Sequence, residues 1–180
     1  PALDEEFAKT LEAESLEDLR AKVRESLKRQ AERQYQEARE RAFLEKLAEG
    51  IEAEIPPSML EAEERHLLEH LAEDLARQGV SLEAYLKALE DRGELEKFRE
   101  DLRQEALKRV KRSLAKEKLA EELKPELGEE EWQAYLQAVA RSYGVSLQEF
   151  RREMGERGLA RLKAGYLQDK AVREAVAQLL

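Results

Sequence analysis

Hydrophobic positions recur every three or four residues along most of this chain, which is the spacing of amphipathic α-helices. The first such line runs over residues 16–27, and no Gly or Pro interrupts the chain from there to Gly50. Ser15 followed by Asp18 has the pattern of a helix N-terminus with an acidic first turn. The pattern predicts one helix of about 35 residues, ending at Gly50.

The middle of this long helix offers a much narrower hydrophobic line. Between residues 28 and 41 only Ala31, Tyr35 and Ala38 continue it. So narrow a stripe can cover only one thin neighbour. We therefore expect the helix to stand partly in solvent, supported by ion pairs such as Glu25 with Arg29 at i, i+4.

The remaining caps and breakers predict further helices of unequal length. Pro56-Pro57 ends an extended connector, and Gly and Ser residues separate the later hydrophobic lines. The expected segments are a connector over 51–55, helices over 58–77, 81–89, 94–123, 129–143 and 146–154, and two last helices after a break at 155–158, ending near Leu180.

The composition supports an all-α fold. Leu, Ala, Glu, Arg and Lys dominate, Ile occurs only at 51 and 55, and charged and hydrophobic residues make up 41% and 42% of the chain. This is too apolar for disorder and unusually polar for a compact globule. With no fixed repeat and no sustained heptad, helical hairpins in one elongated domain are favoured over a long coiled coil.

Charge and hydropathy exclude several classes of protein. A net charge of −9 argues against a general nucleic-acid binder, and the basic cluster at 108, 109, 111 and 112 is expected to be a solvated helix face. No apolar run reaches the roughly 20 residues of a membrane span, and the first residues lack a signal-peptide pattern. We expect a soluble, cytoplasmic protein. Dense charge without Cys or Asn is typical of a thermophilic source or of a GC-rich genome.

No residue constellation predicts catalysis. His66 and His70 are one helical turn apart, but Leu67 stands where a zinc protease requires Glu after its first histidine. Neither histidine accompanies a nucleophilic Ser, and no Gly-rich phosphate loop occurs. The pair is expected to flank a leucine stripe, with metal capture as the alternative. We therefore expect no enzyme activity, no metal site and no cofactor.

Apolar residues near the helix breaks are the better candidates for function. A thin helical assembly cannot shelter all of them, and exposed apolar patches usually mark binding surfaces. Tyr143, Phe150 and Met154 are expected to face the same way beside Gly144. The candidate binding residues are Met59, Leu60, Leu67, Tyr143, Val145, Leu147, Phe150, Met154, Leu159 and Tyr166.

Six short motifs, in order, resemble trigger factor. They are LDEEFAK (3–9), SLEDLR (15–20), IPPSMLE (55–61), GVSLEAYL (79–86), EALKRVK (105–111) and DKAV (169–172). The resemblance implies the substrate-binding domain of a bacterial chaperone that holds unfolded or nascent polypeptides without ATP. Residues 111–118 are more polar than is usual in the family, which implies a charge-rich cradle.

The resemblance also implies an organisation. A body of residues 1–57 and 167–180 carries a first arm, 58–124, and a second arm, 125–166, which together form the cradle. The family's ribosome-docking module and prolyl isomerase module have no match here, so isomerase activity is not expected, and ribosome contact is expected only through the missing module. Self-association through exposed apolar patches is possible on this account. A helical scaffold that binds one fixed partner is the alternative function.

Overall fold

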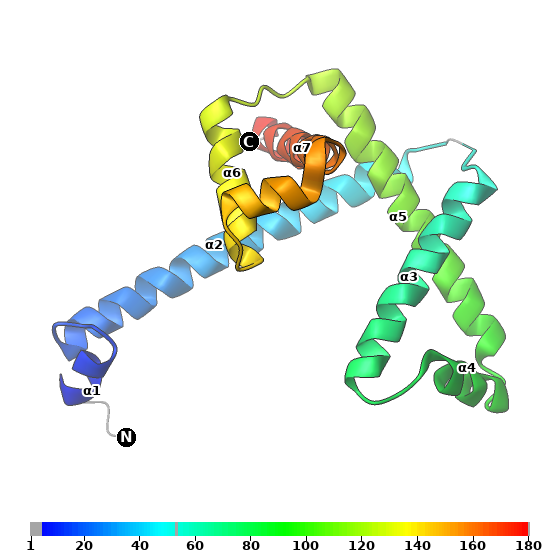
Figure 1. Cartoon of the computed structure of the whole chain (residues 1–180), viewed down its shortest axis with the longest axis horizontal. Coiled ribbons are helices and arrows are strands. Elements are labelled where there is room, and N and C mark those ends of the chain that lie inside the picture. Colours follow the sequence, from blue (N-terminus) through cyan, green and yellow to red (C-terminus); the bar gives the residue numbers. More distant parts are fainter. Residues whose placement is uncertain (1–4, 53, 180) are drawn as a thin grey trace. The chain divides into compact units, whose positions relative to one another are not determined.

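The computed structural model describes residues 5–52 and 54–179, and every regular element within them is an α-helix (Figure 1). The prediction of an all-α fold is thus confirmed. Leu3 and Asp4 of the first motif, and Leu180 at the expected end of the last helix, lie outside the described residues. The helices are α1 (Glu5–Thr10), α2 (Leu16–Glu49), α3 (Pro57–Arg77), α4 (Leu82–Asp91), α5 (Leu95–Leu123), α6 (Glu129–Ser142) and α7 (Leu147–Gln178).

Side-chain caps begin several helices where the sequence predicts. The Ser81 hydroxyl accepts a hydrogen bond from the backbone N–H of Ala84 at 3.1 Å. At the start of α7, Ser146 and Glu149 each accept a hydrogen bond from the other's backbone N–H, at 3.2 and 3.0 Å, which is a capping box. These bonds satisfy N–H groups that have no partner inside the helix.

The break expected near Gly155 is a kink inside one helix. Gly155 has φ 61° and ψ 178°, a backbone conformation open almost only to glycine, and helical geometry resumes after it. The prediction of two further helices after this point is wrong, because residues 156–178 continue as one. The kink turns the capped first segment of α7 away from the rest.

The chain forms two compact units that divide between Phe43 and Leu44, within α2. In the first unit, Ala8 and Ala13 are buried, whereas α2 is exposed throughout residues 20–38. The expectation that the middle of this helix stands in solvent is confirmed. The sequence-based grouping into one body and two arms stays a prediction.

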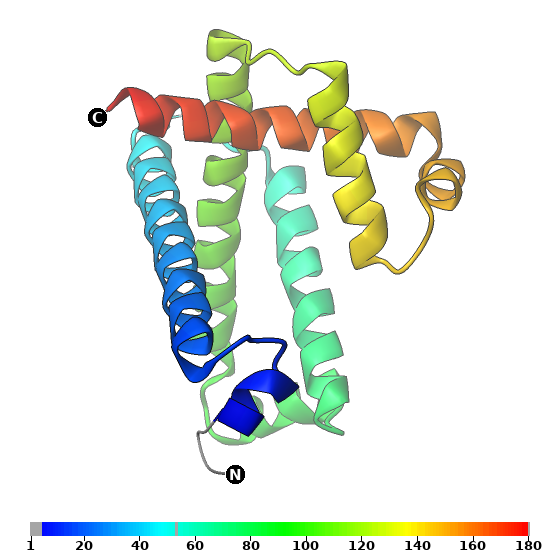
Figure 2. The ribbon, with the colours of Figure 1, turned by 90° about the vertical axis from the view of Figure 1, so that its left-hand side faces the viewer.

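In the second unit, α5 is the central helix. It packs against α3 and also against α7, while α4 joins the ends of α3 and α5, and α6 packs against α7 (Figure 2). Ala106 and Ala115 of α5 and Ala171 of α7 are fully or almost fully buried. Their small side chains suit helices that pack closely. Larger side chains of α3, α5 and α7 are buried with them: Leu75, Val110, Val172 and Val176.

Candidate binding surfaces

Helices α6 and α7 share a small hydrophobic core. Trp132, Leu136 and Ala140 lie on one face of α6 and pack with Phe150 of α7. All four are buried, and Leu136 is only 1% exposed. Five of the candidate residues surround this core and are half-buried: Val145, Leu147, Met154, Leu159 and Tyr166.

Tyr143 and Phe150 are placed very differently, although both were expected to face outward. Tyr143 is 72% exposed at the end of α6, whereas Phe150 is 5% exposed. The expectation of a shared exposed face is wrong for Phe150, because α6 covers the face of α7 on which it lies. Tyr143 stays open to a ligand, and Met154 presents only part of its side chain.

The hydroxyl of Tyr166 takes part in a hydrogen-bond network with Glu131 and Lys170. Its hydroxyl donates a hydrogen bond to one carboxylate oxygen of Glu131 at 2.6 Å, and Lys170 donates to the other at 2.7 Å. The bond from Lys170 is the main cause that lowers the pKa of Glu131, with Tyr166 second. The bond to Glu131 in turn raises the pKa of the Tyr166 hydroxyl. Tyr166 thus helps to join α6 to α7.

Helix α3 carries three candidate residues that differ in exposure. Met59 is 40% exposed near the start of α3, while Leu60 and Leu67 are half-buried. Met59 lines a groove of about 520 Å³ together with Val110 of α5. Its flexible thioether side chain suits contact with varied apolar groups.

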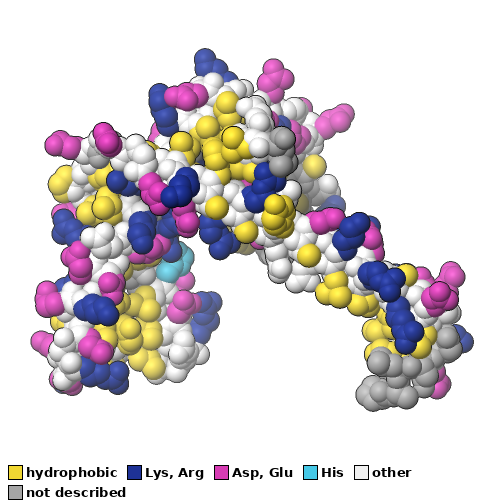
Figure 3. Space-filling model, turned by 180° about the vertical axis from the view of Figure 1, so that it is seen from behind, with side chains coloured by type: hydrophobic (Ala, Val, Ile, Leu, Met, Phe, Trp, Pro, Cys, Tyr) yellow, Lys and Arg dark blue, Asp and Glu magenta, His cyan; other side chains and the backbone are white. Residues whose placement is uncertain are grey.

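A larger apolar groove lies where α4 meets α3 and α5. It has a volume of about 690 Å³, and α3, α4 and α5 all contribute to it. Figure 3 shows hydrophobic side chains gathered near the histidines of α3. The apolar lining residues are Leu68, Leu82, Leu86, Leu95, Phe98 and Leu102.

None of these six residues was among the candidates from the sequence. Leu95, Phe98 and Leu102 follow the hydrophobic line of α5, and such a line is normally buried core. Here all six remain half-buried, because α4 is short and covers the two longer helices incompletely. One feature of the sequence could have indicated this groove: α4 is short and carries four apolar residues, Leu82, Tyr85, Leu86 and Leu89.

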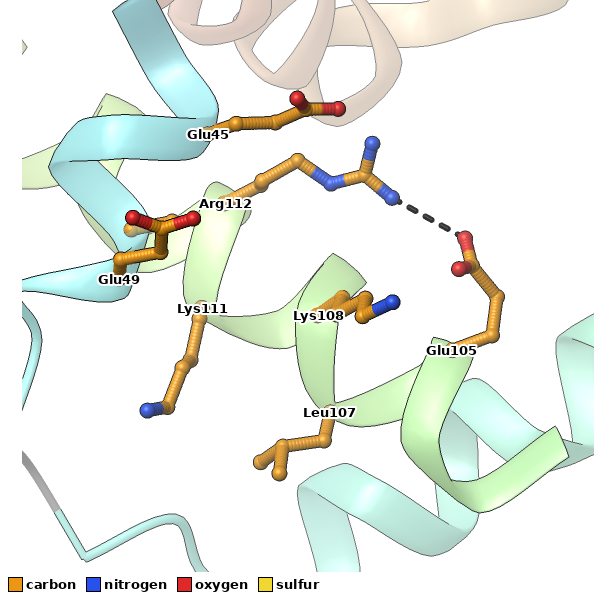
Figure 4. A pocket seen from close by; sticks show the side chains of 8 residues that line it. Glu45, Glu49, Glu105, Leu107, Lys108, Lys111 and Arg112 are labelled. Carbon is orange, nitrogen blue, oxygen red and sulfur yellow. Dashed lines mark hydrogen bonds and ion pairs between the residues drawn. The ribbon is translucent and has the colours of Figure 1, made fainter. Parts of the chain in front are cut away.

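A third groove, of about 510 Å³, has a charged lining (Figure 4). Glu45 and Glu49 from the end of α2 lie across it from Lys108, Lys111 and Arg112 of α5. The guanidinium of Arg112 bonds to the carboxylate of Glu105 at 3.1 Å. The basic cluster of α5 is therefore interspersed with carboxylates, and Lys111 and Arg112 are half-buried instead of fully solvated as expected.

The described part of the chain was also searched for metal-ligand clusters and for membrane-spanning helices. Within it, no group of three or more His, Asp or Glu side chains is placed to hold a metal ion. None of the helices in residues 5–52 and 54–179 is long and apolar enough to cross a membrane.

Comparison with known proteins gives a consistent result. Residues 15–178 match the family model of the bacterial trigger factor C-terminus. A trigger factor of Thermus thermophilus is 76% identical over 179 residues, which cover 99% of this chain and 44% of that protein. Trigger factor of Deinococcus deserti is 36% identical over 177 residues, covering 98% of this chain and 40% of that protein.

Solved structures agree with the sequence relatives. A structure of trigger factor domains from Thermotoga maritima is 25% identical, with a TM-score of 0.58, and the match covers 81% of this chain and 83% of that one. A trigger factor chaperone described for promiscuous substrate recognition in folding and assembly has the same TM-score and identity, covering 100% of this chain and 43% of that one. The chain spans less than half the length of the curated relatives it matches. It belongs to the trigger factor family, and it corresponds to the family's C-terminal region.

Proposed function

We propose that this chain holds unfolded or nascent polypeptides without ATP, through separate apolar surfaces on its two arms. The observation that carries the proposal is the apolar groove lined by Leu86, Phe98 and their neighbours in the first arm. Tyr143 in the second arm and Met59 in the first add exposed contacts. Family membership, and the substrate recognition described for one trigger factor, support the same function.

The energetics of such surfaces favour weak and reversible holding. Burial of one Leu, Met or aromatic side chain contributes roughly 1.5 to 3 kcal/mol before the costs of association and ordering. A few contacts together reach about −8 kcal/mol, which corresponds to micromolar affinity. Charged residues such as Glu83, Lys87 and Glu90 line the same groove and keep it hydrated between encounters.

The proposal extends to the organisation of the whole protein. The body of residues 1–57 and 167–180 would carry the two arms, and ribosome contact would belong to a part of trigger factor outside this chain. The chain itself would act as a binding module and not as an enzyme, with no prolyl isomerase activity and no cofactor. Its place of action would be the bacterial cytoplasm.

An aggregation assay tests the proposal. Several unrelated denatured proteins are diluted into buffer with and without the chain, in the absence of nucleotide, and light scattering is followed. We expect the chain to slow aggregation of most of them at roughly micromolar concentration. A chain that protects one protein and ignores the rest would instead be a scaffold for a fixed partner. Sedimentation of the chain alone shows whether self-association through the same surfaces competes with binding.

A further inference from the structure

The chain carries two methionines, Met59 and Met154, and no cysteine, so these two thioethers hold its only sulfur atoms. Met59, near the start of α3, is 40% exposed, whereas Met154 packs against the core shared by α6 and α7. We propose that Met59 is a site of reversible oxidation, where a hydroperoxide converts the thioether to a sulfoxide and thereby weakens polypeptide holding. The effect on holding rests on the proposed function, but the site itself does not.

Met59 is the main accessible apolar group of the groove that it lines. This groove, of about 520 Å³, lies between α3 and α5, and its other apolar lining residues are Ala62 and Val110. Val110 is only 5% exposed, and Ala62 offers a single methyl group. The rest of the lining is polar or charged: Glu63, Arg65, His66, Glu69, Arg109 and Ser113. A sulfoxide at Met59 would therefore leave the groove with hardly any accessible apolar surface.

The oxidation is a two-electron step that needs no catalytic residue. The sulfur lone pair attacks one oxygen of the hydroperoxide, an S–O bond forms, and the O–O bond breaks. Sulfur is oxidised and the peroxide is reduced, because its other oxygen takes the proton of the transferred oxygen and leaves as water or as an alcohol. The product is polar where the thioether was apolar. Arg65 and Arg109 line the same groove and carry N–H donors for the new oxygen.

Met154 is the comparison within the same chain, because close packing surrounds its side chain. A Cβ placed on Gly158 would lie 3.2 Å from Cε of Met154 and 3.7 Å from its Sδ. The side chain thus lies directly over the backbone of Gly158, and it also packs against the core that contains Trp132 and Phe150. With less room for the approaching peroxide and for the added oxygen, Met154 should react more slowly than Met59.

Oxidation of Met59 would act on binding and not on folding. A flexible thioether adapts to varied apolar side chains, whereas a sulfoxide gives up hydrogen bonds to water when it is buried against them. Met59 lies at the surface, so the added oxygen disturbs no core. Methionine sulfoxide reductases return the sulfoxide to the thioether, which makes the loss of binding reversible.

Treatment of the full chain with hydrogen peroxide, followed by peptide mass spectrometry, tests the site. We expect the sulfoxide to form at Met59 at least about fivefold faster than at Met154, and to be removed by methionine sulfoxide reductases. While only Met59 has reacted, the unfolding curve reported by Trp132 fluorescence should not change. Equal rates at the two methionines, or faster oxidation of Met154, would overturn the assignment whether or not the chain binds polypeptides.

The affinity for a labelled, permanently unfolded protein, measured before and after peroxide, tests the consequence. In Met154→Leu, a swap of similar volume, only Met59 can be oxidised, and peroxide should weaken binding about threefold or more. In Met59→Leu, the same brief treatment should change the affinity by less than about twofold. An equal loss in both variants, or no loss in either, would overturn the role of Met59.

The parent chain provides the same test without a substitution. Its affinity should fall when Met59 is oxidised and recover after treatment with the reductases, so the question is decided even if a variant fails to fold. An affinity that does not follow the sulfoxide content of Met59 would contradict the proposal. Absence of binding by the untreated parent would contradict the proposed function, and with it the effect on holding, while the oxidation rates still decide the site.

Discussion

The ring of Tyr143 stacks on that of Phe150, with centroids 6.0 Å apart and an interplanar angle of 25°. One partner is exposed and the other buried, so the proposed binding residue Tyr143 lies directly on the core of α6 and α7. A polypeptide that binds Tyr143 would contact a ring whose other face packs on the buried ring of Phe150. Substitutions at these two positions should therefore have opposite consequences for stability and for binding.

Phe150→Ala should destabilise the packing of α6 on α7 by about 3 to 5 kcal/mol, because it removes a buried ring from their small shared core. Tyr143→Ser should change stability by no more than about 0.5 kcal/mol, as is usual for an exposed position. The single tryptophan, Trp132, lies in this core and reports its unfolding by fluorescence. Equal stability of the Phe150→Ala variant and the parent would show that the core does not depend on that ring.

The Glu131 network should make stability depend on acid pH. The pKa of this carboxyl is lowered, chiefly by Lys170, so its charged form is favoured in the folded chain. Its contribution is present above the ordinary value of 4.5 and is lost as the pH falls through the lowered value. Glu131→Gln should lower the melting temperature at pH 7, and the difference from the parent should close in acid.

A neighbouring carboxylate gives the control for this measurement. Glu130→Gln alters an exposed residue one position earlier, and the melting temperature should stay close to that of the parent at both pH values. A difference between Glu131→Gln and the parent that persists unchanged in strong acid would contradict the assigned role of the charge.

The kink in α7 should depend on glycine at position 155. The φ of 61° is strained for any other residue, so Gly155→Ala should cost about 1 to 3 kcal/mol. Gly165→Ala, within the regular part of the same helix and with open space at the added Cβ, should instead stabilise it by about 0.5 to 1 kcal/mol. Thermal unfolding of both variants measures the difference, and equal effects would mean that α7 can straighten.

The apolar groove between α3, α4 and α5 should contribute to polypeptide binding. Leu86→Gln keeps a similar size but places an amide among the apolar lining residues, so it should weaken binding of a denatured protein several-fold. Ala88→Gln changes an exposed residue of the same helix outside this lining and serves as the control. Calorimetric titration of both variants decides the point, and equal affinity would remove the groove from the binding surface.

Much of the secondary structure could be predicted because local signals specify it. The Ser81 and Ser146 caps place the starts of α4 and α7, and the glycines at 79, 93 and 144 follow the ends of α3, α4 and α6 within two residues. The kink at Gly155 was located but interpreted as a break, because a single glycine does not reveal whether the next helix continues.

The candidate surfaces were harder to predict because they depend on tertiary contacts. Phe150 and Met154 are four residues apart and share a helix face, but only the structure shows that α6 covers Phe150. The groove at Leu68, Leu86 and Phe98 joins three helices, and its openness depends on how far α4 extends across the other two. No spacing within a single helix contains that information.

The most direct test of polypeptide holding is a titration of a labelled, permanently unfolded protein with the chain, followed by fluorescence anisotropy without nucleotide. We expect micromolar affinity, weakened by about tenfold or more when Met59→Ser and Tyr143→Ser are combined. Tyr35→Ser changes another exposed tyrosine, on α2 and outside the candidate surfaces, and should leave affinity unchanged within about twofold. Absence of binding by the parent chain, or equal affinity of the double variant and the parent, would contradict the account.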